Sequence, residues 1–217
     1  MSPIMRYIFP ILYYTLGTIF RLLYRVEAVG LENVPEGGVL LYPNHSDAID
    51  PVLIGACLPV KFDLRLHTMA KDSLFTNKPF AAFIRSLGAF PIRRGEADLQ
   101  AVKTAMQALR AGDNLLMFPE GTRVRNGVSV HEGVPVRAHS GAVMIGIRTG
   151  ATMIPVYSGG PKKLFRKTRI VFGEPYEPVY SGRHGTSEEL DEIAQDMLAQ
   201  AYALGGETVT EEVPVCR

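Results

Sequence analysis

The chain has 217 residues, 47% of them hydrophobic and 21% charged, so it is long enough to bury one sizeable core. Its 23 Lys and Arg against 22 Asp and Glu leave a formal charge of +1, which argues for neither a nucleic-acid partner nor an acidic one, and a site for a polyanion must be local. Cys57 and Cys216 make no disulfide framework and no metal-ligand spacing, so we expect a reducing, cytoplasmic setting.

The first 26 residues form an apolar segment. Between Arg6 and Arg21 lie 14 residues without a charge, fewer than the roughly 20 that span a bilayer, and the segment lacks the small-residue cleavage site of a signal peptide. Arginines beside many aromatic side chains are typical of a helix lying in a membrane interface. A buried core helix is the alternative, although Pro10 and Gly17 would weaken one. We therefore expect residues 1–26 to associate with a membrane.

Residues 27–204 alternate short β-like runs with runs of helical period, which is typical of a single α/β domain. No repeat or low-complexity tract interrupts them, and we expect the polar residues 205–217 to be disordered. The expected strands are residues 37–43, 64–70, 88–94, 114–119, 151–157 and 168–173.

Two helices are clearest in the pattern. Asp98 can cap the N-terminus of a helix over residues 98–111. Thr186 and Glu189 have the spacing of a capping box at the start of a helix over residues 187–204. The expected apolar faces are Leu99, Val102, Met106 and Leu109 in the first helix, and Leu190, Ile193, Met197, Leu198 and Ala201 in the second.

The stretch PNHSDAIDP, residues 43–51, follows an expected strand and precedes a helix that we expect to open near Ser46 or Asp47. Such strand-to-helix turns present side chains at the carboxyl edge of a sheet, where α/β sites usually lie. Asp47 is placed to cap the helix. Asp50 lies about 140° from His45 round an ideal helix, but the turn lets His45 point back over the first helical turn. Asp50 can then fix the imidazole tautomer and leave the other ring nitrogen as a general base, although a lone loop histidine is usually structural or exposed.

The stretch FPEGTR, residues 118–123, ends another expected strand. Gly121 allows a tight turn, Thr122 offers a hydroxyl, and Arg123 is a fixed cation suited to gripping phosphate or carboxylate. Glu120 would neutralise Arg123 or hydrogen-bond a substrate hydroxyl. A surface turn with one salt bridge is the plainer interpretation.

Three further cations also follow expected strands. Arg93 and Arg94 close the run GAFPIRR, and because adjacent strand residues point to opposite faces, at most one of them needs to face a site. Lys71 follows the run LHTMA. The chain shows no Ser or Cys in a nucleophile elbow and no metal-ligand spacing. One His–Asp pair with several cations indicates a base that activates a substrate hydroxyl beside an anion-holding pocket.

The blocks NHSDAID, GAFPIRR, FPEGTR and IPV (residues 154–156), in this order over about 110 residues, resemble the four sequence blocks of the glycerolipid acyltransferases, specifically the bacterial 1-acyl-sn-glycerol-3-phosphate acyltransferases. The resemblance covers the chain from about residue 7 to 175. It implies a single α/β domain of that family, with a mixed central sheet flanked by helices and an N-terminal helical segment at the membrane interface. It also implies that His45 is the general base and that Asp50 orients it.

The implied activity is that of a 1-acylglycerol-3-phosphate O-acyltransferase in phospholipid biosynthesis. His45 takes the proton from the sn-2 hydroxyl of lysophosphatidic acid, the oxygen attacks the thioester of acyl-CoA or acyl carrier protein, and phosphatidic acid forms. A backbone N–H near the start of the following helix is a candidate to stabilise the oxyanion. The thioester is a co-substrate, and no cofactor, metal or nucleic acid is implied. The implied location is the cytoplasmic face of the cell membrane, as a peripheral or monotopic protein.

The resemblance also implies a set of substrate-binding residues. They are Lys71, Arg94 and Arg123 for the acceptor phosphate, Glu120, Gly121 and Thr122 for the shape of the acceptor site, and Pro155 for the apolar wall of an acyl chain. Two positions depart from the family pattern, because Asp47 stands where the family usually has Ser and Arg93 where it commonly has an acid. Asp47 can still serve as a cap, whereas Arg93 leaves the headgroup of the acceptor open.

Other functions also remain open at this point. The acceptor could be glycerol 3-phosphate or another lysolipid, although the short chain favours lysophosphatidic acid. The protein could instead be a non-catalytic peripheral membrane protein that binds lipid, although both His45 and Asp50 are present. A hydrolase that uses His45 to activate water is a third possibility. Neither the acyl donor, its chain length nor the oligomeric state follows from the sequence.

Overall fold

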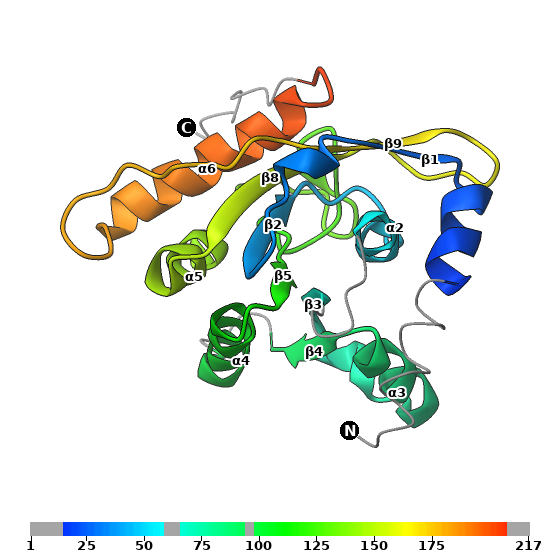
Figure 1. The fold of residues 1–217 in the computed structure, drawn as a ribbon, viewed down its shortest axis with the longest axis horizontal. Coiled ribbons are helices and arrows are strands. Elements are labelled where there is room, and N and C mark those ends of the chain that lie inside the picture. Colours follow the sequence, from blue (N-terminus) through cyan, green and yellow to red (C-terminus); the bar gives the residue numbers. More distant parts are fainter. Residues whose placement is uncertain (1–14, 59–65, 94–97, 208–217) are drawn as a thin grey trace.

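The computed structural model describes residues 15–58, 66–93 and 98–207. At its centre lies a seven-stranded sheet in the order β1-β9-β8-β2-β5-β3-β4, with helices on both faces (Figure 1). The strands of this sheet are β1 (Val26–Val29), β2 (Val39–Pro43), β3 (Leu66–Lys71), β4 (Ala89–Ile92), β5 (Asn114–Leu116), β8 (Thr152–Ser158) and β9 (Thr168–Phe172). The helices are α2 (Asp50–Cys57), α3 (Lys78–Ser86), α4 (Leu99–Arg110), α5 (Gly141–Thr149) and α6 (Ser187–Ala203), with short 3-10 turns η1 (Leu31–Asn33) and η2 (Asp72–Phe75).

The sheet is mixed, and five of its strands set the position of the site. Strands β8, β2, β5, β3 and β4 are mutually parallel, whereas β9 runs antiparallel to β8 and carries β1 beside it. Because the five parallel strands point the same way, the loops that follow them meet at one carboxyl edge. All six expected strands are present. Strand β1 and the hairpin of β6 (Val124–Arg125) and β7 (Val128–Ser129) were not predicted, because such short strands carry little pattern.

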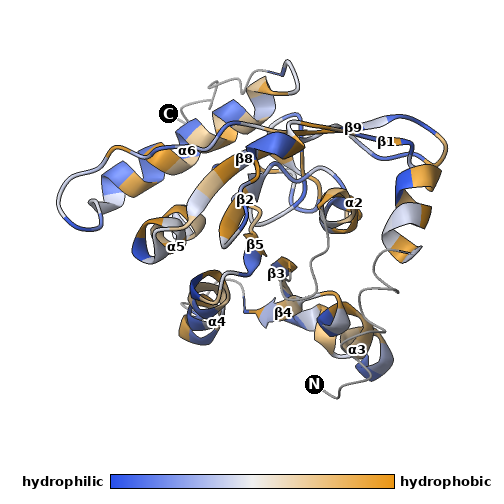
Figure 2. Cartoon of the chain, viewed as in Figure 1, coloured by the Kyte–Doolittle hydropathy of each residue, from blue (hydrophilic) through white to orange (hydrophobic). Residues whose placement is uncertain are grey.

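The core lies in two layers, one on each face of the sheet. Along β2, Leu40 and Tyr42 pack with α4, α5 and α6, whereas Val39 and Leu41 pack with α2. Since successive strand residues point to opposite faces, a strand buried on both faces is apolar throughout, which explains the sequence VLLYP. The Tyr42 hydroxyl donates to the carbonyl of Ala194 at 3.1 Å and ties the central strand to α6. Figure 2 shows α6 alternating between hydrophobic and hydrophilic stretches, as a half-buried helix requires.

Both expected helix starts are confirmed. The Asp98 side chain accepts the N–H of Ala101 at 3.0 Å at the start of α4, and Thr186 and Glu189 form the capping box of α6. The expected apolar stripe of α6 is also confirmed. The expected face of α4 is wrong at Leu99, whose residue is 69% exposed, because α4 packs mainly through its alanines.

The two ends of the chain are only partly described. Residues 1–14 of the expected membrane segment and residues 208–217 of the expected disordered tail lie outside the described residues. Residues 15–23 are helical, and Phe20 and Tyr24 pack against the core on the side of α2. Among the described helices, none is both long and apolar enough to cross a bilayer.

Candidate active site

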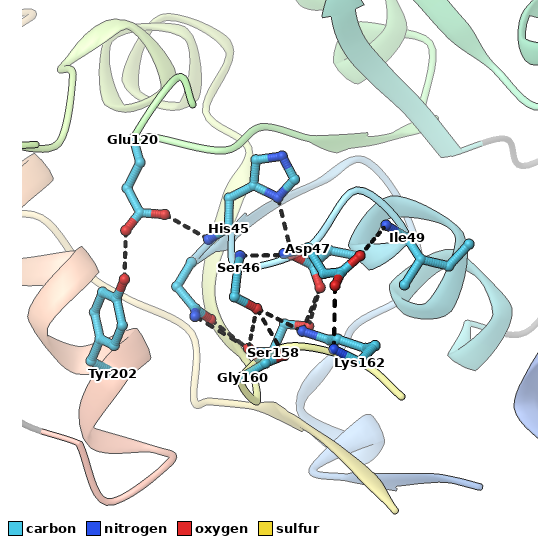
Figure 3. A network of polar contacts seen from close by, with 11 residues as sticks. His45, Ser46, Asp47, Ile49, Glu120, Ser158, Gly160, Lys162 and Tyr202 are labelled. Carbon is cyan, nitrogen blue, oxygen red and sulfur yellow. Dashed lines mark hydrogen bonds and ion pairs between the residues drawn. The ribbon is translucent and has the colours of Figure 1, made fainter. Parts of the chain in front are cut away.

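The polar side chains at the carboxyl edge of the sheet converge on the turn between β2 and α2. Figure 3 shows His45, Ser46 and Asp47 in this turn, with Glu120 and Tyr202 on one side and Ser158 and Lys162 on the other. These residues come from four separate parts of the sequence, and the parallel order of β5, β2 and β8 brings them together.

His45 and Asp50 make the contact that the sequence predicts. The Nδ1 atom of His45 lies 3.0 Å from Oδ2 of Asp50, and the two side chains are 14% and 0% exposed. A carboxylate at Nδ1 favours the tautomer in which Nε2 carries the free lone pair. Within the described residues, no group hydrogen-bonds to Nε2, and the ring lies against Phe118 with centroids 4.1 Å apart. The pair therefore has the geometry of a general base with its orienting carboxylate.

Several donors hold the Asp50 carboxylate. Its Oδ2 atom accepts the backbone N–H groups of Ser46 and Asp47, each at 2.8 Å, and its Oδ1 atom accepts the hydroxyl of Ser158 at 3.0 Å. Burial raises the pKa of Asp50, but the hydrogen bond from His45 and the nearby lysine charge outweigh it, and the pKa is lowered overall. Asp50 is therefore a fixed anion at the first residue of α2, where the helix dipole favours negative charge.

The expected helix cap at Asp47 is wrong. Helix α2 begins at Asp50, and its N-cap residue, Ile49, makes no side-chain capping bond. The Oδ1 atom of Asp47 instead accepts the N–H of Ile49 at 3.3 Å, which closes a turn before the helix. Pro51 explains the late start, because proline is favoured in the first turn of a helix.

The backbone donors of this turn point inward. The N–H groups of Ser46, Asp47 and Ile49 all donate to carboxylate oxygens within the turn. These three N–H groups are therefore already used, and none of them is available to stabilise an oxyanion.

Lys162 completes the network, and the sequence interpretation missed it. Its Nζ atom lies 2.5 Å from Oδ1 of Asp50 and 2.8 Å from Oγ of Ser46, and its side chain is 0% exposed. In Figure 3 the His45 ring and Lys162 lie on opposite sides of the network. Lys162 follows β8 in the run GGPKK, so the strand-end argument that selected Arg123 would also have found it.

Asn44 fastens the end of β2 to the end of β8. Its Nδ2 atom donates to the carbonyl of Ser158 at 3.2 Å, and its Oδ1 atom accepts the N–H of Ser158 at 2.7 Å. The Oγ atom of Ser46 lies 3.4 Å and 3.2 Å from the carbonyl oxygens of Ser158 and Gly160. The two strand ends therefore leave the sheet as one unit, which limits the movement of His45.

Glu120 turns inward, away from the predicted salt bridge with Arg123. It is 2% exposed, its Oε2 atom accepts the N–H of His45 at 2.6 Å, and its Oε1 atom accepts the hydroxyl of Tyr202 at 2.6 Å. Burial raises the pKa of Glu120 to about 7. No ion pair joins Glu120 to Arg123 in the described part of the chain, where the Glu120 carboxylate instead accepts from His45 and Tyr202. Glu120 therefore holds the backbone of His45 directly.

Arg123 pairs with a histidine of the neighbouring hairpin. Its guanidinium Nη2 lies 2.5 Å from Nε2 of His131. The next residue, Val124, donates its N–H to the carbonyl of His45 at 2.7 Å. The backbone hydrogen bond of Val124 therefore places Arg123 one residue from a direct contact with His45. Arg123 itself is half-buried.

Gly121 and Thr122 form the turn between Glu120 and Arg123. Gly121 has a φ of 63°, and a Cβ atom there would approach the His139 ring to 3.2 Å. Both features favour glycine at this position. Thr122 is half-buried.

The cations after β3 and β4 lie farther along the same edge. Lys71 is the exposed last residue of β3, and only β5 separates β3 from β2. The Arg93 side chain is 66% exposed, and its Nε atom lies 3.8 Å from a carboxylate oxygen of Asp98. Arg94 lies outside the described residues.

Pro155 lies inside β8 and lines a cavity of about 790 Å³ between that strand, α6 and residues 173–179. The lining of the cavity includes neither His45 nor Asp50. Pro155 therefore borders a space separate from the His–Asp pair.

The described residues contain no cluster of His, Cys, Asp or Glu that could hold a metal ion. Cys57 is buried in α2, and burial raises the pKa of its thiol to about 11. A thiol in this state is inert near neutral pH.

Residues 25–159 match the family described as Acyltransferase, and this range includes His45 and Asp50 but ends before Lys162. The chain is 31% identical over 156 residues to the 1-acyl-sn-glycerol-3-phosphate acyltransferase of Bacillus subtilis (strain 168), which covers 69% of this chain and 73% of the relative. It is 31% identical over 185 residues to the protein of the same name from Streptococcus pneumoniae (strain ATCC BAA-255 / R6), which covers 82% of this chain and 64% of the relative.

A solved structure shares the fold. It is the crystal structure of the 1-acyl-sn-glycerophosphate (LPA) acyltransferase PlsC from Thermotoga maritima, with a TM-score of 0.60 and 22% sequence identity. The match covers 85% of this chain and 76% of that chain.

Proposed function

Because the chain belongs to the acyltransferase family, we propose that it is a 1-acylglycerol-3-phosphate O-acyltransferase. The acceptor is lysophosphatidic acid, and the product is phosphatidic acid. The observation that carries the proposal is the contact between His45 and Asp50, which leaves Nε2 of the imidazole without a partner in the described residues. The two bacterial relatives named for this activity support the choice of acceptor.

The reaction proceeds by general-base catalysis. Nε2 of His45 takes the proton of the sn-2 hydroxyl while Asp50 stabilises the imidazolium that forms. The hydroxyl oxygen attacks the carbonyl carbon of the acyl thioester, the new C–O bond forms, and the C–S bond breaks. The thiolate of coenzyme A or acyl carrier protein then takes the proton from His45. The thioester is a co-substrate, and the reaction uses no cofactor.

The acceptor phosphate binds the cations along the same sheet edge. Arg123 is the best placed of them, because the backbone of the next residue is hydrogen-bonded to His45. An arginine also matches a phosphate with two parallel N–H donors. Lys71 contributes from the end of β3, Arg94 contributes a further positive charge, and Gly121 and Thr122 shape the turn beside the phosphate.

Membrane contact involves the N-terminal helical segment and the loop after β8. The helical residues Ile19 and Leu22 and the loop residues Leu164 and Phe165 are all exposed large hydrophobics. The N–H of Phe165 donates to the carbonyl of Leu23 at 2.6 Å, so helix and loop lie side by side (Figure 1). Phe165 has a φ of 63°, a left-handed backbone conformation that is strained for a residue with a side chain, and it is 67% exposed.

The loop also carries exposed cations around its apolar residues, namely Lys163, Arg166 and Lys167. Apolar side chains beside basic ones fit the surface of an anionic bilayer. The protein therefore acts as a peripheral or monotopic protein at the cytoplasmic face of the membrane, where its lipid acceptor resides.

A direct assay tests the proposal. Purified protein receives lysophosphatidic acid with acyl-CoA or with acyl carrier protein thioester, and the lipid products are identified by mass. We expect phosphatidic acid from the wild-type protein and a loss of rate of at least about 100-fold in His45→Ala, with an unchanged circular dichroism spectrum.

The same assay separates the alternatives. Thioester cleavage without an acceptor would indicate a hydrolase. Faster transfer to glycerol 3-phosphate or to another lysolipid than to lysophosphatidic acid would identify that compound as the acceptor. A folded protein that binds lipid but turns over none of these substrates would exclude the enzyme.

A further inference from the structure

Lys162 and Asp50 form an ion pair that is removed from water. Both side chains are 0% exposed, and Nζ of Lys162 lies 2.5 Å from Oδ1 of Asp50. Burying two charges costs several kcal/mol of solvation, which a close and well hydrogen-bonded pair can offset. A buried pair is therefore weak support for a stabilising role alone, and its place beside His45 suggests a role in the reaction.

We propose that Lys162 is a positioning residue for the catalytic pair, acting on His45 through Asp50. The inference rests on the proposed function, because it concerns the same general base. The ammonium binds the Oδ1 atom of Asp50, so the other oxygen, Oδ2, faces Nδ1 of His45. The three groups form a line in which the carboxylate stands between the imidazole and the ammonium.

Both the backbone and the side chain of Lys162 are hydrogen-bonded to the turn that carries His45. Its N–H donates to Oδ2 of Asp47 at 3.3 Å, and its Nζ atom donates to Oγ of Ser46 at 2.8 Å. The loop after β8 is therefore attached to both sides of the turn that carries His45. Without Lys162, the Oδ1 atom of Asp50 would keep only the hydroxyl of Ser158 as a donor, and the carboxylate would gain freedom to rotate.

The charge of Lys162 also matters to the base. A bare carboxylate beside His45 would strongly favour the imidazolium, which cannot accept the substrate proton. Lys162 places a positive charge on the other side of the same carboxylate and so offsets this effect. Burial lowers the pKa of Lys162, while the charges of Asp50, Asp47 and Glu207 oppose that shift.

Other ionisable groups that face the network bear on any pH effect. Glu120 contacts the backbone of His45 on the side away from Lys162, and the negative charge of Asp50 raises the pKa of Glu120. Asp47 and Glu207 act on Lys162. These carboxylates are unchanged in the variants below, so a comparison with the wild-type protein isolates the charge of Lys162.

The first experiment compares Lys162→Met with Lys162→Arg and with Lys103→Met, which removes an exposed lysine of α4. The readout is kcat/KM for lysophosphatidic acid as a function of pH. In Lys162→Met the site carries one more negative charge, which favours the imidazolium. We therefore expect the acid limb of the pH profile, where kcat/KM rises as His45 loses its proton, to move up by about one pH unit. We also expect kcat to fall roughly 10-fold to 100-fold, with KM for the acceptor within about twofold of wild type. Lys162→Arg and Lys103→Met should keep the wild-type limb.

An acid limb that stays in place in folded Lys162→Met would overturn the inference, even if the rate fell. If wild-type protein formed phosphatidic acid in that experiment, the proposed function would stand and only the role of Lys162 would fail. NMR titration of the His45 imidazole in the wild-type and Lys162→Met proteins measures its pKa directly and needs no acceptor. We expect the pKa to be higher in Lys162→Met. That measurement judges the inference even if the acyltransferase assay fails.

A second pair of variants covers the case in which Lys162→Met does not fold, since it leaves Asp50 as a lone buried charge. Asp50→Asn is compared with the double variant Asp50→Asn, Lys162→Met, in which both charges are gone. A residue that acts through Asp50 adds little once Asp50 is lost, so we expect the two rates to agree within about threefold. A folded double variant at least tenfold slower than Asp50→Asn would show a role independent of Asp50 and contradict the proposal.

Discussion

Glu120 is a buried carboxylate that pairs with no cation among the described residues, and it holds the backbone of the proposed base. Its two oxygens accept the N–H of His45 and the hydroxyl of Tyr202, so one side chain links the loop after β5, the turn between β2 and α2, and α6. Burial raises its pKa to about 7. The arrangement therefore makes the position of His45 sensitive to the ionisation of Glu120.

The raised pKa of Glu120 predicts a pH-dependent contribution to stability. Since the folded pKa of about 7 exceeds the ordinary value of 4.5, the stabilising contribution is fully present below about pH 4.5 and is lost as the pH rises through about 7. The loss by pH 8 is at most roughly 3 kcal/mol. Urea unfolding of wild-type protein and Glu120→Gln at pH 5 and pH 8 should show wild type losing most, but not all, of this amount relative to the variant, because pH 5 already lies above the ordinary value of 4.5. A difference independent of pH would contradict the raised pKa.

At the scale of elements, the hairpin of β6 and β7 links Arg123, the cation proposed to bind the acceptor phosphate, to His45, the proposed base. Val124 in β6 donates to the carbonyl of His45, and His131, just after β7, binds the guanidinium of Arg123. A two-residue strand has little stability of its own. Its contacts with the turn between β2 and α2 therefore give the hairpin a defined position.

Arg123→Ala tests the role of this hairpin in binding. A charge-assisted hydrogen bond contributes about 1.5–3 kcal/mol, so we expect KM for lysophosphatidic acid to rise roughly 10-fold to 100-fold while kcat changes by less than about threefold. Arg125→Ala is the matched control, because Arg125 is an exposed arginine of the same hairpin. Unchanged acceptor saturation in Arg123→Ala would argue against the phosphate role.

At the scale of the whole molecule, one loop joins the proposed membrane surface to the proposed site. Lys162 is buried at the base of the loop after β8, and the exposed Leu164 and Phe165 follow within three residues. The loop lies beside the helical residues 15–23. Contact with a bilayer through these residues would bring the carboxyl edge of the sheet toward the lipid acceptor.

Charge substitution on this surface tests the membrane contact. Leu22 and Phe165 are 71% and 67% exposed, and burying each in a bilayer is favourable by about 1.5–3 kcal/mol. In the double variant Leu22→Glu, Phe165→Glu we expect co-sedimentation with phosphatidylglycerol vesicles to fall at least about tenfold. Leu99→Glu, Val179→Glu changes two other exposed apolar residues by the same charge and should bind like wild type. Equal binding by both double variants would refute this surface.

The sequence by itself determined six of the strands, the starts of two helices and several local contacts. Six strands, the cap at Asp98 and the capping box of Thr186 and Glu189 follow from short-range patterns, because caps join residues three apart. The pairing of His45 with Asp50 is likewise a contact across five residues. Asp47 was one local error, since the sequence pattern placed the start of α2 too early, and the exposed Leu99 of α4 was another.

Only the tertiary structure decided which polar groups meet. Glu120 is 75 residues from His45, and Lys162 is 116 residues from Ser46, yet each pair is hydrogen-bonded. Such contacts depend on the order of β5, β2 and β8 in the sheet, which no local pattern contains. Strand-end position selected Arg123 and Glu120 alike, but in the structure the carboxylate turns inward and the guanidinium stays half-exposed. Of these two side chains only the carboxylate can accept the backbone N–H of His45, because a guanidinium has donors and no acceptor.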